Sequence, residues 1–213
     1  LIVEHLQPYV PALLLDQFGN YVVQCVLPFG FPRATFILDA MVDRCWEIAQ
    51  GRFGARSMRT VLEHASVPRV QLKRVAMAII LHCVPLATSA NGALLLTWLL
   101  DTSGLDGVMS QLAPRFVPHL AQLCTHKLAS VTVLRIVGQS ADPGAAVLLL
   151  RAIFDLPQAV VLEEILLDLV HGSQLVAKAL QSPMLSPEAY AECVDKVAAI
   201  LCRHELVGAP AYL

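Results

Sequence analysis

Apolar residues recur along the chain at steps of three and four, which is the spacing of one face of an α-helix. One example is the set Phe36, Ile37, Ala40, Met41 and Ile48. The pattern predicts helical stretches over residues 3–15, 35–48, 70–86, 109–123 and 145–167, with the last one broken at Pro157. A final amphipathic helix is predicted over 188–203, followed by a tail at 207–213. No β-rich segment is visible, so the predicted fold class is all-α.

The stretch LLLDQFGNYVVQCVL at 13–27 predicts a further helix, entered through the segment DQFG at 16–19. Its centre, QFGNYVVQ, is matched position for position by RFGARSMR at 52–59. The segments ANGALLLT at 90–97 and VHGSQLVA at 170–177 keep the glycine, and KLASVTVL at 127–134 has Ala129 in that place. The aligned positions are Asn20, Ala55, Ala93, Ser130 and Ser173, separated by 35, 38, 37 and 43 residues. A period of about 36 residues is typical of a repeat architecture.

The period predicts an α-solenoid of about five two-helix repeats at 1–30, 31–66, 67–104, 105–142 and 143–183, with a capping helix within 184–213. Proline- and glycine-rich breakers separate the repeats, for example PFGFP at 28–32. Composition agrees, because 56% of the residues are hydrophobic and only 15% are charged. Each repeat of a solenoid buries faces against both neighbours, which requires a high apolar content.

Composition also excludes several classes of protein. No apolar run reaches the length of a membrane span. The six cysteines are widely spaced without a C-x-x-C pair, so we expect a reduced intracellular protein without disulfide or zinc framework. The histidines show no metal-ligand spacing, and no nucleophile or glycine-rich phosphate loop accompanies the acidic residues. We therefore expect no metal, no cofactor, no small-molecule substrate and no enzymatic activity.

The most informative polar residues are Asn20, Tyr21 and Gln24. Asn20 and Gln24 are four residues apart and share one face of a helix, with Tyr21 beside them. An amide can donate and accept hydrogen bonds at once, so two amides and an aromatic ring can hold a flat, hydrogen-bonding object such as a base. The alternative is that these side chains only decorate a solvated helix face.

The segment DQFGNYVVQ at 16–24 and the period near 36 resemble the repeats of the Pumilio-homology (PUF) family. The first repeat matches the family motif closely, whereas repeats two to five are degenerate. The degeneracy, and the endings ILLD at 165–168 before HGS at 171–173, resemble the divergent fungal class that also carries an RNA-recognition-motif domain. The resemblance implies a right-handed, curved solenoid whose second helices line a concave surface and each read about one base of single-stranded RNA.

For this chain the resemblance implies that Asn20 and Gln24 bind the edge of a base, that Tyr21 stacks beside it, and that the base is uracil. In repeat two, Ala55 cannot read an edge, so we expect Arg56 to stack between bases and Arg59 to contact a base or a phosphate. Arg52 adds a backbone contact, and Ser130 is the corresponding candidate in repeat four. The expected element is two to four nucleotides, completed by repeats upstream of this chain.

The resemblance implies post-transcriptional regulation of mRNA through uracil-containing elements in 3′ untranslated regions, in the cytoplasm. The formal net charge of −2 argues against RNA, since nucleic-acid binders often carry a basic surplus. The competing hypothesis is a protein-binding scaffold of the armadillo or HEAT kind, favoured by the apolar positions of repeats three and four. Protein partners on the degenerate repeats or on the convex face are compatible with both.

Overall fold

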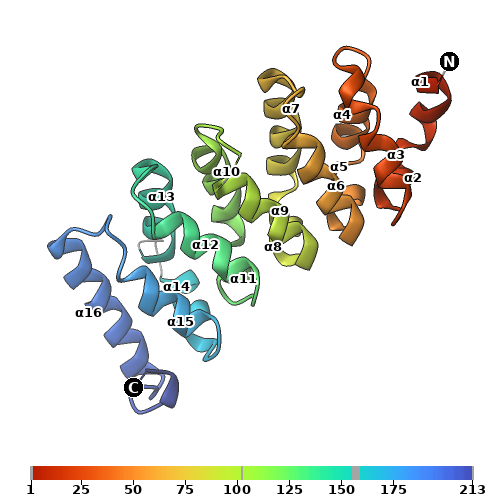
Figure 1. Ribbon diagram of the computed structural model, residues 1–213. Helices are drawn as coiled ribbons and strands as arrows, with labels where there is room; N and C mark the ends of the chain where they lie inside the picture. Colours follow the sequence, from red (N-terminus) through yellow and green to blue (C-terminus); the bar gives the residue numbers. More distant parts are fainter. Residues whose placement is uncertain (1, 102, 155–158, 213) are drawn as a thin grey trace. The chain divides into compact units, whose positions relative to one another are not determined.

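The computed structural model describes residues 2–101, 103–154 and 159–212 (Figure 1). Every regular element among these residues is helical. The chain forms two compact units, Leu1–Asp106 and Gly107–Leu213.

Unit 1 contains three repeats, each with three helical segments. The first repeat has α1 (Ile2–Leu6), which runs into the 3₁₀ turn η1 (Gln7–Tyr9), then α2 (Val10–Leu15) and α3 (Gly19–Gln24). After the 3₁₀ turn η2 (Leu27–Phe29), the second repeat has α4 (Thr35–Asp43), α5 (Cys45–Gln50) and α6 (Arg52–Leu62). The third repeat has α7 (Arg69–Leu81), α8 (Cys83–Thr88) and α9 (Ala90–Asp101).

Unit 2 follows the same order. Its first repeat has α10 (Val108–Phe116), the 3₁₀ turn η3 (Val117–His119), α11 (Leu120–Cys124) and α12 (Ala129–Val137). Its second repeat has α13 (Pro143–Phe154), α14 (Val160–Leu167) and α15 (Gly172–Ala179). The chain then forms α16 (Pro187–Arg203) and the 3₁₀ turn η4 (Pro210–Tyr212).

Each repeat contains three helices rather than the expected two, because the upstream helical stretch of each repeat is divided into two helices. Arg44 separates α4 from α5 and His82 separates α7 from α8, both with backbone angles outside the α-helical range. Pro8 and Pro118 lie in the 3₁₀ turns that interrupt the first and fourth stretches, and Pro157 lies outside the described residues. The stretch predicted as one helix over 13–27 is also divided, since residues 13–15 belong to α2 and the next helix begins at Gly19.

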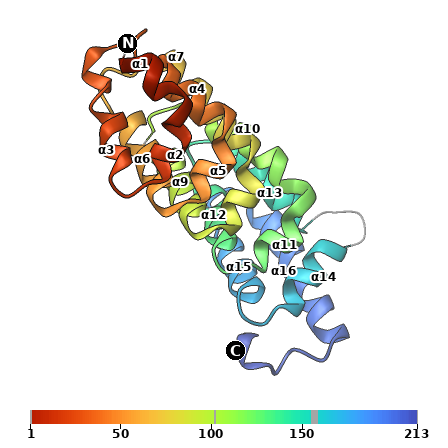
Figure 2. The same ribbon diagram turned by 90° about the vertical axis from the view of Figure 1, so that its right-hand side faces the viewer.

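Many of these helices have only five or six residues, and an isolated helix of that length is unstable in water. They form because equivalent helices of neighbouring repeats pack together. In unit 1, α3 contacts α6, α6 contacts α9, and α4 contacts α7. In unit 2, α10 contacts α13, α11 contacts α14, and α12 contacts α15; α10 and α13 are seen side by side in Figure 2. This layer-on-layer packing is how a solenoid buries its apolar residues.

The C-terminal helix α16 packs against α14 of the last repeat. Its first turn is capped by Ser186, whose side-chain oxygen accepts a hydrogen bond from Ala189 N at 3.2 Å. At its other end, Glu163 on α14 accepts hydrogen bonds from Arg203 and interacts with His204 Nε2 at 2.5 Å. The C-terminal end of α16 is therefore fixed to α14.

The recurring glycine marks a close approach between the second and third helices of a repeat. A Cβ atom added at Gly54 would lie 2.0 Å from Ile48 O, and one added at Gly172 would lie 2.0 Å from Ile165 O. At Gly92 the corresponding distance to Leu86 O is 2.7 Å. In these three repeats the third helix therefore begins directly against a backbone carbonyl of the second, and only a residue without a side chain fits there.

We predict that Gly54→Ala destabilises the protein by roughly 1–3 kcal/mol, because the new methyl group meets a carbonyl that cannot rotate away. Gly144→Ala is the matched control, since its added Cβ would come no closer than 3.7 Å to Asp142 Oδ1. The measurement is urea unfolding followed by circular dichroism. Equal unfolding midpoints for the two variants would contradict the close approach.

Candidate nucleic-acid interface

Each third helix is entered through a turn that is held, in most repeats, by one side-chain acceptor. In the first repeat, Asp16 Oδ1 accepts hydrogen bonds from Phe18 N at 2.9 Å and Gly19 N at 2.6 Å. The equivalent acceptors are Ser89 Oγ before α9, His126 Nδ1 before α12 and Asp168 Oδ1 before α15. These bonds satisfy the backbone N–H groups that a helix start leaves unpaired, and they fix where the third helix begins.

Asn20 is turned into the structure rather than presented on an exposed face. Its side chain is 7% exposed, and its Nδ2 donates to Asp16 O at 2.8 Å and to Gln17 O at 2.9 Å. Its Oδ1 accepts from Gln24 Nε2 at 3.0 Å. The expectation of two amides on one exposed face therefore needs correction, because both donors of Asn20 are committed to the turn. Its oxygen and the half-buried Gln24 amide are the groups with remaining hydrogen-bonding capacity.

A first cleft of about 230 Å³ lies between α3 and α6. Tyr21, whose side chain is 56% exposed, and Arg56 both contribute to its walls. The remaining lining residues are Gln17, Phe18, Asn20 and Phe53. The structure thus brings Asn20, Tyr21 and Arg56 together, as the repeat alignment predicts, with Gln24 bonded to Asn20 behind them.

A second cleft of about 440 Å³ lies between α6 and α9. Arg52, Arg56 and Arg59 line it, so the three predicted arginines do share one site, and Arg56 belongs to both clefts. The remaining lining residues are Ala55, Asn91, Leu94 and Leu95. Arg52 also lies over the ring of Phe53, 5.8 Å from its centroid. The two clefts are therefore consecutive, with one guanidinium between them.

Several of these lining residues were not predicted from the sequence, although the repeat alignment contained a signal for them. Phe53 and Asn91 both stand two positions before the aligned residue of their repeat, and both face the preceding repeat's cleft. The same offset in the first repeat gives Phe18. A regular offset from the period could therefore have found these three residues.

Ser130 lies on α12 in unit 2 and is not a lining residue of either cleft of unit 1. It is 6% exposed, and its Oγ donates to Lys127 O at 3.4 Å. The exposed residue at the start of α12 is instead Val131. The serine therefore supports the turn before α12, and an apolar side chain takes the outward position.

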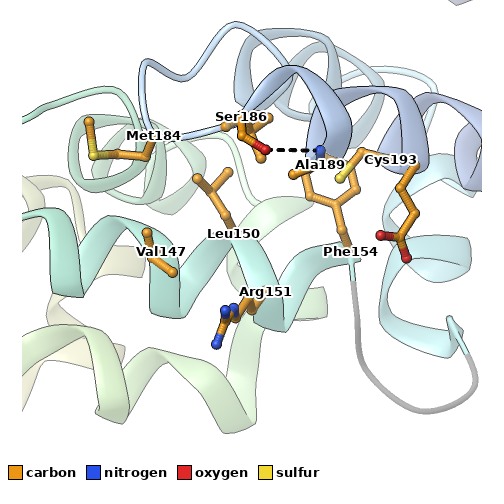
Figure 3. A pocket seen from close by; sticks show the side chains of 10 residues that line it. Val147, Leu150, Arg151, Phe154, Met184, Ser186, Ala189 and Cys193 are labelled. Carbon is orange, nitrogen blue, oxygen red and sulfur yellow. Dashed lines mark hydrogen bonds between the residues drawn. The ribbon is translucent and has the colours of Figure 1, made fainter.

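A third cavity, of about 390 Å³, lies in unit 2 between α13 and the start of α16 (Figure 3). Its deeper walls are the buried side chains of Leu150, Phe154 and Cys193, and its charged lining residues are Arg151 and Glu192. No group of three potential metal ligands occurs among the described residues, and none of their helices is long and apolar enough to cross a membrane. The arginine-lined clefts of unit 1 are therefore the candidate site.

No family model matches the chain. It is 41% identical, over 192 residues, to a Pumilio domain-containing protein of Schizosaccharomyces pombe, covering 90% of this chain and 29% of the relative. The structure of the PUM-HD domain of S. pombe Puf1 in complex with RNA matches with a TM-score of 0.83 and 38% identity, covering 99% of this chain and 55% of that one. The chain belongs to the Pumilio (PUF) family. The mRNA-binding protein PUF2 of Saccharomyces cerevisiae is 37% identical over 204 residues, covering 92% of this chain and 19% of PUF2.

Membership of the Pumilio family confirms the predicted all-α solenoid of PUF-type repeats. The chain spans less than a third of the length of the curated relatives it matches. The predicted RNA-recognition-motif domain of the divergent fungal class stays a prediction.

The turn that positions α3 should make stability depend on pH. Hydrogen bonds from Gly19 N and Phe18 N hold the pKa of Asp16 below its usual value. Because the folded pKa is lowered, the stabilisation is present above the unfolded pKa of about 3.9 and is lost as the pH falls through the folded pKa. Asp16→Asn should therefore flatten the dependence of unfolding free energy on pH below about pH 4.

The measurement is urea unfolding at a series of pH values from neutral to strongly acidic. Asp43→Asn is the control, because it removes an exposed carboxylate at the end of α4 without touching this turn. If Asp16→Asn reproduces the wild-type curve, the carboxylate does not stabilise the turn through these bonds.

Proposed function

We propose that this chain binds single-stranded RNA through the two consecutive clefts of unit 1. The observation that carries the proposal is the position of Arg56, which lines both clefts and faces Tyr21 across the first. Aromatic rings and guanidinium planes are the surfaces on which unstacked bases lie in RNA-binding proteins. The relatives support the proposal, since one is named an mRNA-binding protein and the Puf1 domain was solved with RNA.

In the first cleft, a base would lie between the ring of Tyr21 and the guanidinium of Arg56. Asn20 Oδ1 and the second N–H of Gln24 Nε2 then offer one acceptor and one donor to its edge. This pair matches the N3–H of uracil and one of its flanking carbonyl oxygens. Uracil is also the base that the family resemblance implies, and adenine, which offers a donor beside an acceptor, is its competitor in a test.

We further propose that the protein acts in post-transcriptional regulation of mRNA through uracil-containing elements of 3′ untranslated regions, in the cytoplasm. A protein-binding scaffold is the second candidate function. It is favoured by the exposed leucine and valine, Leu94 on α9 and Val131 on α12, at positions where the first two repeats have Tyr21 and Arg56.

Gln24→Ala should weaken binding to a uracil-containing single strand by roughly 1–3 kcal/mol, because the first cleft loses its free donor. Asn20→Ala should weaken it as well, but it also removes two bonds that hold the turn and should lower the unfolding free energy by about 1 kcal/mol or more. Fluorescence anisotropy with short RNAs carrying each of the four bases measures the first effect, and urea unfolding measures the second.

Gln111→Ala, on α10 of unit 2, removes an exposed amide outside the clefts and should bind like the wild type. Undiminished binding by Gln24→Ala, or the absence of RNA binding by the wild type, would favour the scaffold hypothesis.

Tyr21→Ala and Arg56→Ala should each cost roughly 1–3 kcal/mol of binding free energy per stacked base. Tyr21→Phe should retain most of the affinity because the ring remains. Arg56→Lys keeps the charge but loses the planar surface, so it should behave like Arg56→Ala if stacking is the main interaction. Full affinity in Arg56→Lys would instead indicate a phosphate contact. Anisotropy titrations at two salt concentrations separate these outcomes.

A further inference from the structure

A carboxylate of unit 1 connects two repeats at the edge of the second cleft. Glu63, at the C-terminal end of α6, accepts a hydrogen bond on Oε1 from Arg59 Nε at 2.9 Å. The same oxygen accepts a hydrogen bond from Trp98 Nε1 at 2.8 Å. Trp98 lies on α9 and is 4% exposed. Arg59 is therefore connected through Glu63 to a buried indole of the next repeat.

This connection fixes the position of Arg59. An exposed pair of arginine and glutamate one helical turn apart is worth little by itself and samples many rotamers. Here the indole N–H comes from a packed side chain, so it holds the carboxylate, and the carboxylate holds the Nε side of the planar guanidinium. The two terminal nitrogens remain as donors.

The second cleft has few other groups that could meet the polar edge of a base. Its lining includes the apolar side chains of Ala55, Leu94 and Leu95. Asn91 Nδ2 already donates to Gln50 O at 2.9 Å. Arg56 lines both clefts and is the proposed stacking surface for a base. Arg52, the third arginine of the cleft, lies over the ring of Phe53. Arg59 is thus the donor best placed to meet acceptor atoms on a base in this cleft.

We propose that Glu63 is a positioning residue for RNA. Together with Trp98, it orients Arg59 so that the guanidinium donates hydrogen bonds to the acceptor atoms of a base that stacks on Arg56. The proposal rests on the proposed function and adds a second base site that has no amide reader. A base fits better than a phosphate, because the neighbouring carboxylate offsets the positive charge that a phosphate would need, while the terminal N–H donors stay available.

The sign of the effect distinguishes positioning from ordinary electrostatics. A carboxylate near bound RNA repels the phosphates, so neutralising it should tighten binding. If Glu63 orients Arg59, neutralising it should weaken binding, and only when the second base is present. The two mechanisms therefore predict opposite results for Glu63→Gln.

The experiment measures anisotropy for wild type, Glu63→Gln, Arg59→Ala and the double variant. All the short RNAs carry uracil at the first position. One set carries each of the four bases at the second position. The other has an abasic nucleotide at the second position. We expect Glu63→Gln and Arg59→Ala each to weaken binding of the best second base by about 3- to 10-fold, the usual range for the net contribution of one hydrogen bond. The double variant should be no weaker than Arg59→Ala, and all variants should bind the abasic strand equally within experimental error.

Two further variants extend the test. Trp98→Phe removes the indole N–H together with the five-membered ring of the indole, and it should weaken binding in the same base-dependent way, while urea unfolding reports its effect on the fold. Glu47→Gln, which neutralises the partner of Arg44 in another exposed ion pair of unit 1, should leave binding unchanged. Binding of the strand with uracil at the first position and an abasic nucleotide at the second should persist in every variant, which shows that the first cleft is intact.

Tighter binding by Glu63→Gln, or an equal loss on the abasic strand, would overturn the positioning role. Failure of the wild type to bind any of these RNAs would refute the proposed function itself, which is a different result. A base-dependent loss in both Glu63→Gln and Trp98→Phe supports the inference.

Discussion

The close approach between the second and third helices of the first three repeats determines how the candidate site is arranged. Gly54, for example, lies against Ile48 O, which leaves no room for a side chain at the start of α6. The residue after the glycine is buried in the first two repeats, as Asn20 and Ala55, whereas the next residue, Tyr21 or Arg56, lines a cleft. The fourth repeat has the same order of a buried and an exposed residue, although an alanine replaces the glycine there. The start of the third helix therefore separates structural from exposed positions in these repeats.

This separation explains which positions carry chemical variety. The inward position holds an amide, alanine or serine, all small enough to be enclosed, and in repeat one the amide also completes the turn. The outward position changes from Tyr21 and Arg56 in the first two repeats to Leu94 and Val131 in the next two. Stacking surfaces are thus concentrated in unit 1. A small residue at the inward position therefore does not show that a base-contacting residue has been lost, because a buried position favours small side chains in any case.

The repeat period, the glycine position and the arginines of the second repeat were all visible in the sequence. The division of the upstream stretches was not, because the apolar spacing continues across Arg44 and His82 although the backbone leaves the helix there. The burial of the Asn20 side chain was also not predicted. Residue spacing shows which side chains share a helix face, but it does not show that Asn20 donates hydrogen bonds to the turn before the helix. The contact of Glu63 with Trp98 joins residues 35 positions apart, and no local pattern indicates it.

The negative formal charge is a weaker objection to RNA binding once the acidic residues are placed. Asp16 and Asp168 accept backbone hydrogen bonds at the starts of α3 and α15, and Glu163 holds the end of the cap helix. Asp39 pairs with Arg74 between α4 and α7. These carboxylates have partners within the chain, whereas Arg52, Arg56 and Arg59 all line one cleft. The local field at that cleft can be positive in a chain of net charge −2, because screening limits distant charges to a Debye length of about 8 Å. Affinity would then depend more on stacking and base contacts than on neutralising many phosphates.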